Sequence, residues 1–169
     1  DIRIFALYEG TTGIQSQDLL GRKVPMQNGK ALELLAAEIM QTIIKASKED
    51  ELKEYAAILG DKLKLSQKVL GHLMPFAMKG NYERYLADAN LFMEYLSIVV
   101  LGWLWLEMAT DAKATLSKSD KKYSEIFYES KIYTMKFYFK YEVPKTNSLA
   151  ASLMSDEVVT IIKDKEYII

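Results

Sequence analysis

The chain has 169 residues, half of them hydrophobic, a formal net charge of −1 and no cysteine. This length suits one domain with a sizeable core, and the near-neutral charge provides no attraction for nucleic acid or an anionic membrane. The absence of cysteine excludes disulfides and thiolate metal sites within the chain. Because it also fits a reducing compartment, we expect a cytoplasmic location. From the near-neutral charge we expect no nucleic-acid partner.

Residues 8–15, Tyr-Glu-Gly-Thr-Thr-Gly-Ile-Gln, form the most specific motif. Thr12 followed by Gln15 is the pattern of a capping box, in which each side chain bonds a backbone amide at the start of a helix. We therefore predict a short helix from Gly13 to Arg22. Its first turn would direct unpaired N–H groups toward a phosphate or a polarised ring, with Glu9 beside it. By spacing alone, we favour an ordinary helix cap.

Periodicity and turn residues predict two long helices after this motif. Pro25 and Asn28-Gly29 mark a loop, and the first long helix spans residues 30–47. Asp50 is the expected N-cap of the second helix, which ends near residues 75–80. The predicted apolar faces are Leu32, Leu35, Ala36, Ile39 and Ile43 in the first helix, and Leu52, Ala56, Leu59, Leu63, Ser66, Leu70 and Leu73 in the second.

A third long helix is predicted from Asn81 or Tyr82 to about Lys113. Its uncharged stretch, residues 95–106, is shorter than the roughly 20 residues that cross a bilayer. We therefore expect no membrane span and interpret this helix as the buried centre of a bundle. Trp103 and Trp105 are then packing residues whose indole N–H groups find partners nearby.

The last long helix is predicted to open at Ser119-Asp120 and to bend or end at Pro144. A shorter helix follows at about residues 149–154. With no confident strand, the fold class is all-α, an up-down bundle of about four long helices plus short N- and C-terminal helices. The residues expected to lie on one side of the last long helix, in the core or an interface, are Phe127, Ser130, Thr134, Phe137 and Tyr141.

The first motif resembles the signature near the end of the flavin-dependent acyl-CoA dehydrogenases. The resemblance covers residues 8–11, Ile14-Gln15 and residues 18–23, while residues 95–109 and 131–142 are similar to the extra C-terminal helices of one branch. It implies that most of the parent protein lies upstream. Residues 1–27 would then end the catalytic helical domain, and residues 28–169 would form a C-terminal helical bundle extension.

The resemblance also implies roles. Glu9 matches the catalytic base that removes the α-proton of an acyl-CoA thioester while the β-hydrogen leaves as hydride to FAD. Gly10, Thr11, Thr12 and Gly13 match the backbone that lies against FAD. The implied partners are acyl-CoA, the upstream domains, other copies in a homo-oligomer and an electron acceptor of unknown identity. We expect the isolated chain neither to hold FAD tightly nor to turn over substrate.

Two alternatives stay open. Some branches of that family carry the base on a different helix, and Ser16 and Gly21 stand where commoner members have basic residues, so we assign Arg22 no substrate role. The second alternative is that the chain is a free-standing helical interaction or scaffold module, whose turn only happens to resemble the dehydrogenase motif. We expect no metal site, because the single histidine, His72, has Val69 rather than glutamate three residues before it.

Overall fold

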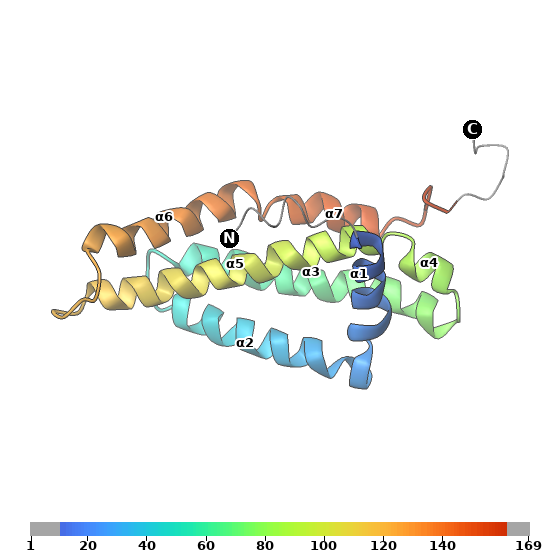
Figure 1. Cartoon of the computed structure of the whole chain (residues 1–169), viewed down its shortest axis with the longest axis horizontal. Coiled ribbons are helices and arrows are strands. Elements are labelled where there is room, and N and C mark those ends of the chain that lie inside the picture. Colours follow the sequence, from blue (N-terminus) through green and yellow to red (C-terminus); the bar gives the residue numbers. More distant parts are fainter. Residues whose placement is uncertain (1–10, 162–169) are drawn as a thin grey trace.

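The computed structural model describes residues 11–161, and every regular element in this range is a helix (Figure 1). This result confirms the predicted all-α class. The elements are α1 (Thr12–Asp18), the π-helix η2 (Leu19–Lys23), the 3-10 helix η3 (Met26–Gly29), α2 (Lys30–Ala46), α3 (Lys53–Met78), α4 (Tyr82–Leu86), α5 (Ala89–Leu116), α6 (Glu125–Tyr141) and α7 (Lys145–Leu153).

The four longest helices, α2, α3, α5 and α6, run beside one another along the long axis of the molecule, as predicted (Figure 1). Helix α5 lies between α6 on one side and α2 on the other, and α2 diverges from it toward one end. At that end α1 crosses the bundle, and α4 and α7 also lie there. The predicted loop at residues 25–29 is confirmed as a turn in which Gln27, Asn28 and Gly29 all have positive φ.

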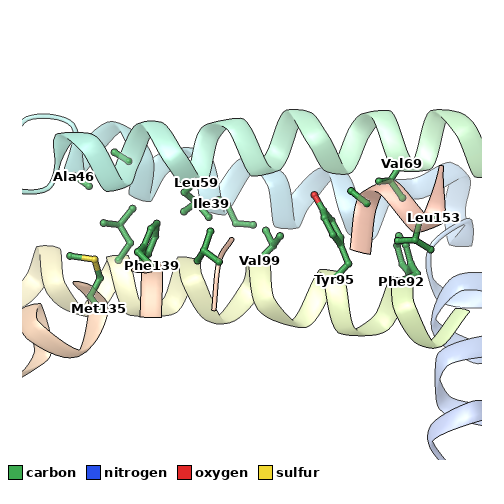
Figure 2. Packing of buried hydrophobic residues seen from close by; sticks show 14 of the residues in the cluster. Ile39, Ala46, Leu59, Val69, Phe92, Tyr95, Val99, Met135, Phe139 and Leu153 are labelled. Carbon is green, nitrogen blue, oxygen red and sulfur yellow. The ribbon is translucent and has the colours of Figure 1, made fainter. Parts of the chain in front are cut away.

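Helix α5 is the predicted central helix, since it packs against α1, α2, α3, α6 and α7. Figure 2 shows Phe92, Tyr95 and Val99 of α5 pointing into the space between α5 and α3. The Trp103 indole N–H donates to Thr42 Oγ1 at 2.8 Å, as expected. Among the helices described, α5 alone has the length and apolar composition of a membrane-spanning segment, and in this fold it is the helix around which the bundle is built.

The predicted central helix is interrupted in the structure. Helix α4 ends at Leu86, and the backbone leaves the helical region at Asp88 before α5 begins. Asn81 is the N-cap of α4 and accepts a hydrogen bond from the Arg84 amide at 3.2 Å. Just before the interruption, the Tyr85 hydroxyl donates to the Leu20 carbonyl at 2.7 Å. Local sequence does not specify this tertiary contact.

Two predicted helix starts are wrong. Helix α3 begins at Lys53, with the fully buried Leu52 at its N-cap position, and the Asp50 carboxylate bonds the Lys53 side chain rather than a backbone amide. Helix α6 begins after Ser124, whose hydroxyl accepts from the Phe127 amide, so residues 119–120 belong to the preceding loop. Pro144 separates α6 from α7, as predicted.

The side of α6 that was expected to lie in the core or an interface is turned outward, so a core position is wrong and an interface position stays a prediction. Phe127, Phe137 and Tyr141 are 39%, 52% and 52% exposed, whereas Met135 and Phe139 on the opposite side are buried. Phe139 packs edge to face on Tyr55 of α3, with ring centroids 5.4 Å apart. Because α6 carries apolar residues on both sides, the pattern of one side did not decide which side faces the core, and tertiary packing placed Met135 and Phe139 inward.

Candidate functional site

The predicted site lies at the start of α1. Glu9 and Gly10 fall outside the described residues, so the position of the predicted base is not assigned. Thr11, Thr12 and Gly13 are described, and all three are exposed. A Cβ atom placed on Gly13 would meet no atom within 4 Å, which shows that the space beside this turn is open.

The helix start differs from the predicted capping box. Thr11, not Thr12, is the N-cap, and no side chain of residues 11–161 bonds the first-turn amides. The first helical hydrogen bond runs from the Gln15 amide to the Thr11 carbonyl at 2.7 Å. Thr12 is already helical and does not act as the cap. Within the described part of the chain, the backbone N–H groups of the first turn thus have no side-chain partner.

The other side of α1 is fixed to the bundle. Ser16 is buried, and its hydroxyl donates to the Gly13 carbonyl at 2.8 Å and lies 2.5 Å from Asn90 Oδ1 at the start of α5. Leu20, one turn further on, is fully buried beneath Tyr85 of α4. These contacts hold α1 in a fixed position on the bundle while its N-terminal turn stays exposed. The sequence motif gave no sign of these anchors, because Asn90 and Tyr85 lie far along the chain.

Arg22 is engaged in a local ion pair. Its guanidinium bonds both carboxylate oxygens of Asp18, at 2.5 and 2.9 Å, and Lys23 lies 3.2 Å from the same carboxylate. The hydrogen bond from Arg22 lowers the pKa of Asp18.

A groove of about 800 Å³ lies between α2 and α3 with α5 as its floor. Its lining is mainly aliphatic, and its central hydroxyls bond within the protein: Tyr95 donates to the Lys62 carbonyl at 3.0 Å and lies 3.1 Å from Ser66 Oγ. The groove therefore offers apolar surface rather than an acid–base pair. In the part of the chain described, no group of three or more acidic or histidine side chains is arranged to hold a metal ion.

Comparison with known proteins identifies the family. Residues 35–161, more than half of the chain, match the family model described as "Acetyl-CoA dehydrogenase C-terminal like". The chain belongs to this family. The chain is therefore an acyl-CoA dehydrogenase C-terminal domain, and the suspected family resemblance is confirmed.

Curated relatives agree with this assignment. The chain is 29% identical over 154 residues to a broad-specificity linear acyl-CoA dehydrogenase of Mycobacterium tuberculosis, covering 88% of this chain and 25% of that protein. It is 26% identical over 145 residues to a butyryl-CoA dehydrogenase of Syntrophomonas wolfei, covering 85% and 23%. It is 33% identical over 119 residues to a 3-methylmercaptopropionyl-CoA dehydrogenase of Ruegeria pomeroyi, covering 70% and 20%. The chain thus spans about a quarter of the length of the first two relatives.

The family match begins within α2, so the Glu9 motif and α1 precede it. The proposed boundary between residues 1–27 and 28–169 stays a prediction. In the structure α1 nevertheless packs directly on α5 of the acyl-CoA dehydrogenase C-terminal domain. Any ligand at the start of α1 would therefore be held by a helix whose position depends on this domain.

A second cluster, which the sequence interpretation missed, joins three elements of the domain. Glu51, between α2 and α3, accepts from Lys113 of α5 at 2.7 Å and from Lys136 of α6 at 2.6 Å. These two hydrogen bonds lower the pKa of Glu51 to about 2. Each carboxylate oxygen already has a lysine partner, so we interpret this cluster as a structural link. The acidic run at residues 49–51 was the only local signal for it.

His72 is a packing residue, as expected. Its ring lies edge to face on Phe76, with centroids 5.6 Å apart, and the Arg84 guanidinium lies 4.8 Å above the same Phe76 ring. Arg84 is buried and donates to the Ser155 carbonyl at 2.5 Å. These contacts hold α3, α4 and the segment after α7 together.

Proposed function

We propose that this chain is the C-terminal part of an FAD-dependent acyl-CoA dehydrogenase that oxidises an acyl-CoA thioester to the 2,3-enoyl-CoA. Family membership supports the enzyme class, and the three relatives carry the names of dehydrogenases of acyl-CoA thioesters. The proposal extends to the partners expected for such an enzyme, namely the upstream domains, other copies of the same chain and an electron acceptor.

The observation that carries the proposal is the open start of α1. Among residues 11–161 its first-turn amides have no side-chain cap, the surface at Thr11, Thr12 and Gly13 is exposed, and the opposite side is fixed by Ser16 and Leu20. Unpaired backbone donors at a helix start suit the electron-rich edge of a flavin or a phosphate. These residues therefore fit FAD, which when bound supplies the acceptor for the β-hydrogen.

Residues of this chain would remove the α-proton and contact the cofactor. Glu9 would remove the α-proton, and Gly10 to Gly13 would approach the cofactor closely, since glycine at both ends of this turn leaves room for a neighbouring ring. The upstream domains would exclude water from the carboxylate. For this reason we propose that the isolated chain is inactive.

The test is the Glu9→Gln variant of the whole protein. We expect enoyl-CoA formation to fall by about 10³-fold, because general-base catalysis commonly contributes 10²–10⁴-fold, while the flavin absorbance is retained. Asp18→Asn is the matched control, since it changes a nearby carboxylate that is occupied by Arg22. Full activity in Glu9→Gln would show that the base lies elsewhere. A whole protein without flavin would favour the scaffold alternative.

A further inference from the structure

The backbone carbonyl of Leu20 receives no hydrogen bond from an amide of its own helical segment, residues 12–23, or from the two residues that follow. Because η2 is a π-helix, the Val24 amide bonds the Leu19 carbonyl at 2.9 Å instead of the Leu20 carbonyl. The next residue is Pro25, which has no N–H group. Leu20 is fully buried, and a buried carbonyl without a donor is costly. This carbonyl therefore needs a donor from another part of the chain.

The Tyr85 hydroxyl of α4 supplies that donor. It lies 2.7 Å from the Leu20 carbonyl oxygen, and burial raises the pKa of Tyr85, so the hydroxyl keeps the proton that it donates. Beside this bond η2 and α4 approach closely, because a Cβ atom on Gly21 would lie 3.3 Å from Leu86 Cδ2. The bond thus fixes η2 against the C-terminal domain at one defined point.

A second contact holds the same helical segment nearer its start. Ser16 is buried, and its Oγ lies 2.5 Å from Asn90 Oδ1 at the start of α5. Because α1 and η2 are continuous, Ser16 lies about 6 Å along the axis from Leu20 and about 6 Å from Thr12. If the segment tilts about Ser16, a shift of about 1 Å at Leu20 therefore moves Thr12 by a similar distance.

We propose that Tyr85 is a positioning residue for removal of the α-proton, acting through the Leu20 carbonyl on the direction of α1. The start of α1 follows the proposed base Glu9 in the sequence, and the role of Tyr85 rests on the proposed function of Glu9. A misplacement of about 1 Å, even one caused far from the reacting atoms, can cost roughly 10²-fold in rate. Partial loss of the support at Leu20 should therefore be measurable in kcat.

A comparison of two buried tyrosines in the whole protein tests this role. Tyr95 of α5 is fully buried and donates to the Lys62 carbonyl at 3.0 Å, so its bond resembles that of Tyr85 but joins α5 to α3 within the bundle. Tyr85→Phe and Tyr95→Phe should both lower Tm, because each removes the hydrogen bond of a buried hydroxyl. Only Tyr85→Phe should lower kcat, by about tenfold, with KM within about twofold of the native value.

A purely structural contact would make the two variants alike. Equal kcat values in Tyr85→Phe and Tyr95→Phe, each with a lowered Tm, would therefore overturn the proposal. Acyl-CoA with deuterium at the α-carbon gives a second readout. The isotope effect on kcat in Tyr85→Phe should be at least as large as in the native protein, because the slowed step breaks that C–H bond. A smaller isotope effect would show that another step is slowed and would contradict the proposal.

Two exposed asparagines provide a comparison that leaves the core intact. Asn90→Ala removes the contact with Ser16 of α1, whereas Asn147→Ala removes a bond from Lys62 Nζ at 2.7 Å that joins α7 to α3. Asn90→Ala should lower kcat about threefold, and Asn147→Ala should leave it unchanged. This pair keeps the test valid if Tyr85→Phe does not fold, and equal kcat values in both variants would count against positioning by the domain.

Hydrogen exchange of the amides of residues 15–20 reports on α1 without turnover. In the whole protein it should speed up about tenfold in Tyr85→Phe and Asn90→Ala and stay within about twofold of native in Tyr95→Phe and Asn147→Ala. Unchanged exchange in both of the first two variants would show that neither contact holds α1, and the proposal would fail.

Glu9→Gln in the same kinetic assay distinguishes this proposal from the proposed function. If Glu9→Gln keeps full activity, the proposed function of Glu9 fails and the role of Tyr85 fails with it. If Glu9→Gln is impaired while Tyr85→Phe matches Tyr95→Phe, Glu9 keeps its role and only the positioning role of Tyr85 is overturned.

Discussion

Helices α5 and α6 are both apolar on more than one side, but their surroundings differ. Helix α5 contacts α1, α2, α3, α6 and α7, and its buried residues occur around much of its circumference. Helix α6 lies at the edge of the bundle, with Ile132, Met135 and Phe139 inward and aromatic rings outward. The comparison shows that apolar composition identifies a helix needing partners, while its place in the fold decides whether one chain provides them all.

The sharpest test of this difference is truncation of one residue in each helix. Leu106→Ala in α5 should lower the free energy of unfolding by about 3 kcal/mol, because Leu106 is fully buried and the change leaves a cavity. Phe137→Ala on the outward side of α6 should lower it by about 1 kcal/mol or less, since its ring is half exposed. Urea unfolding at a concentration that keeps the chain monomeric measures both. Equal losses would show that the outward side of α6 is covered within one copy.

Removing one threonine hydroxyl that bonds α5 and one that bonds α6 should give a smaller difference in stability. Thr42→Val should cost about 1–2 kcal/mol, because it leaves the Trp103 indole N–H of α5 without its acceptor in a largely buried site. The same substitution at Thr134 of α6 removes only a bond to the Ser130 carbonyl of its own helix, and should be nearly neutral. Chemical denaturation of the two variants compares them directly, and a neutral Thr42→Val would remove the proposed importance of this contact.

The smallest expected effect concerns Glu51, which bonds a lysine from each of the two helices. Its pKa falls from 4.5 to about 2 on folding, so its stabilisation is fully present above about pH 4.5 and is lost as the pH falls toward 2. Because the side chain is 38% exposed, solvent screening limits the effect to about 1 kcal/mol.

The measurement is the difference in unfolding free energy between the native chain and Glu51→Gln at pH 7 and at pH 2.5. The difference should shrink at the lower pH. Asp50→Asn is the control, since Asp50 bonds only the exposed Lys53 and joins no other helix. A difference that stays constant between the two pH values would show that Glu51 contributes through packing rather than through its charge.

Local signals predicted several features of the fold correctly. Asn81 caps α4 with its side chain, the turn before α2 uses the positive φ of Gly29, and Pro144 separates α6 from α7. Each of these features depends on residues within one helical turn of each other. The resemblance of residues 8–15 likewise pointed to the correct family from side-chain types alone.

Predictions failed where a distant residue decided the outcome. The capping box at Thr12 does not form, since Thr11 is the N-cap and Ser16 holds the helix against Asn90. The fully buried Leu52 occupies the N-cap position of α3 without a side-chain cap, and Asp50 bonds the Lys53 side chain instead. Glu51 bonds Lys113 and Lys136, which lie 62 and 85 positions further along the chain. No local sequence pattern distinguishes Glu51 from other acidic residues.

The amino-acid order by itself determined the helical class, most of the helix positions and the family signature, because helical periodicity and turn preferences act over a few residues. Tertiary structure decided which side of α6 faces the core, where the chain breaks between α4 and α5, and how firmly α1 is held. These choices depend on contacts such as Tyr85 with Leu20, 65 residues apart, whose favourable burial exists only once the bundle has assembled.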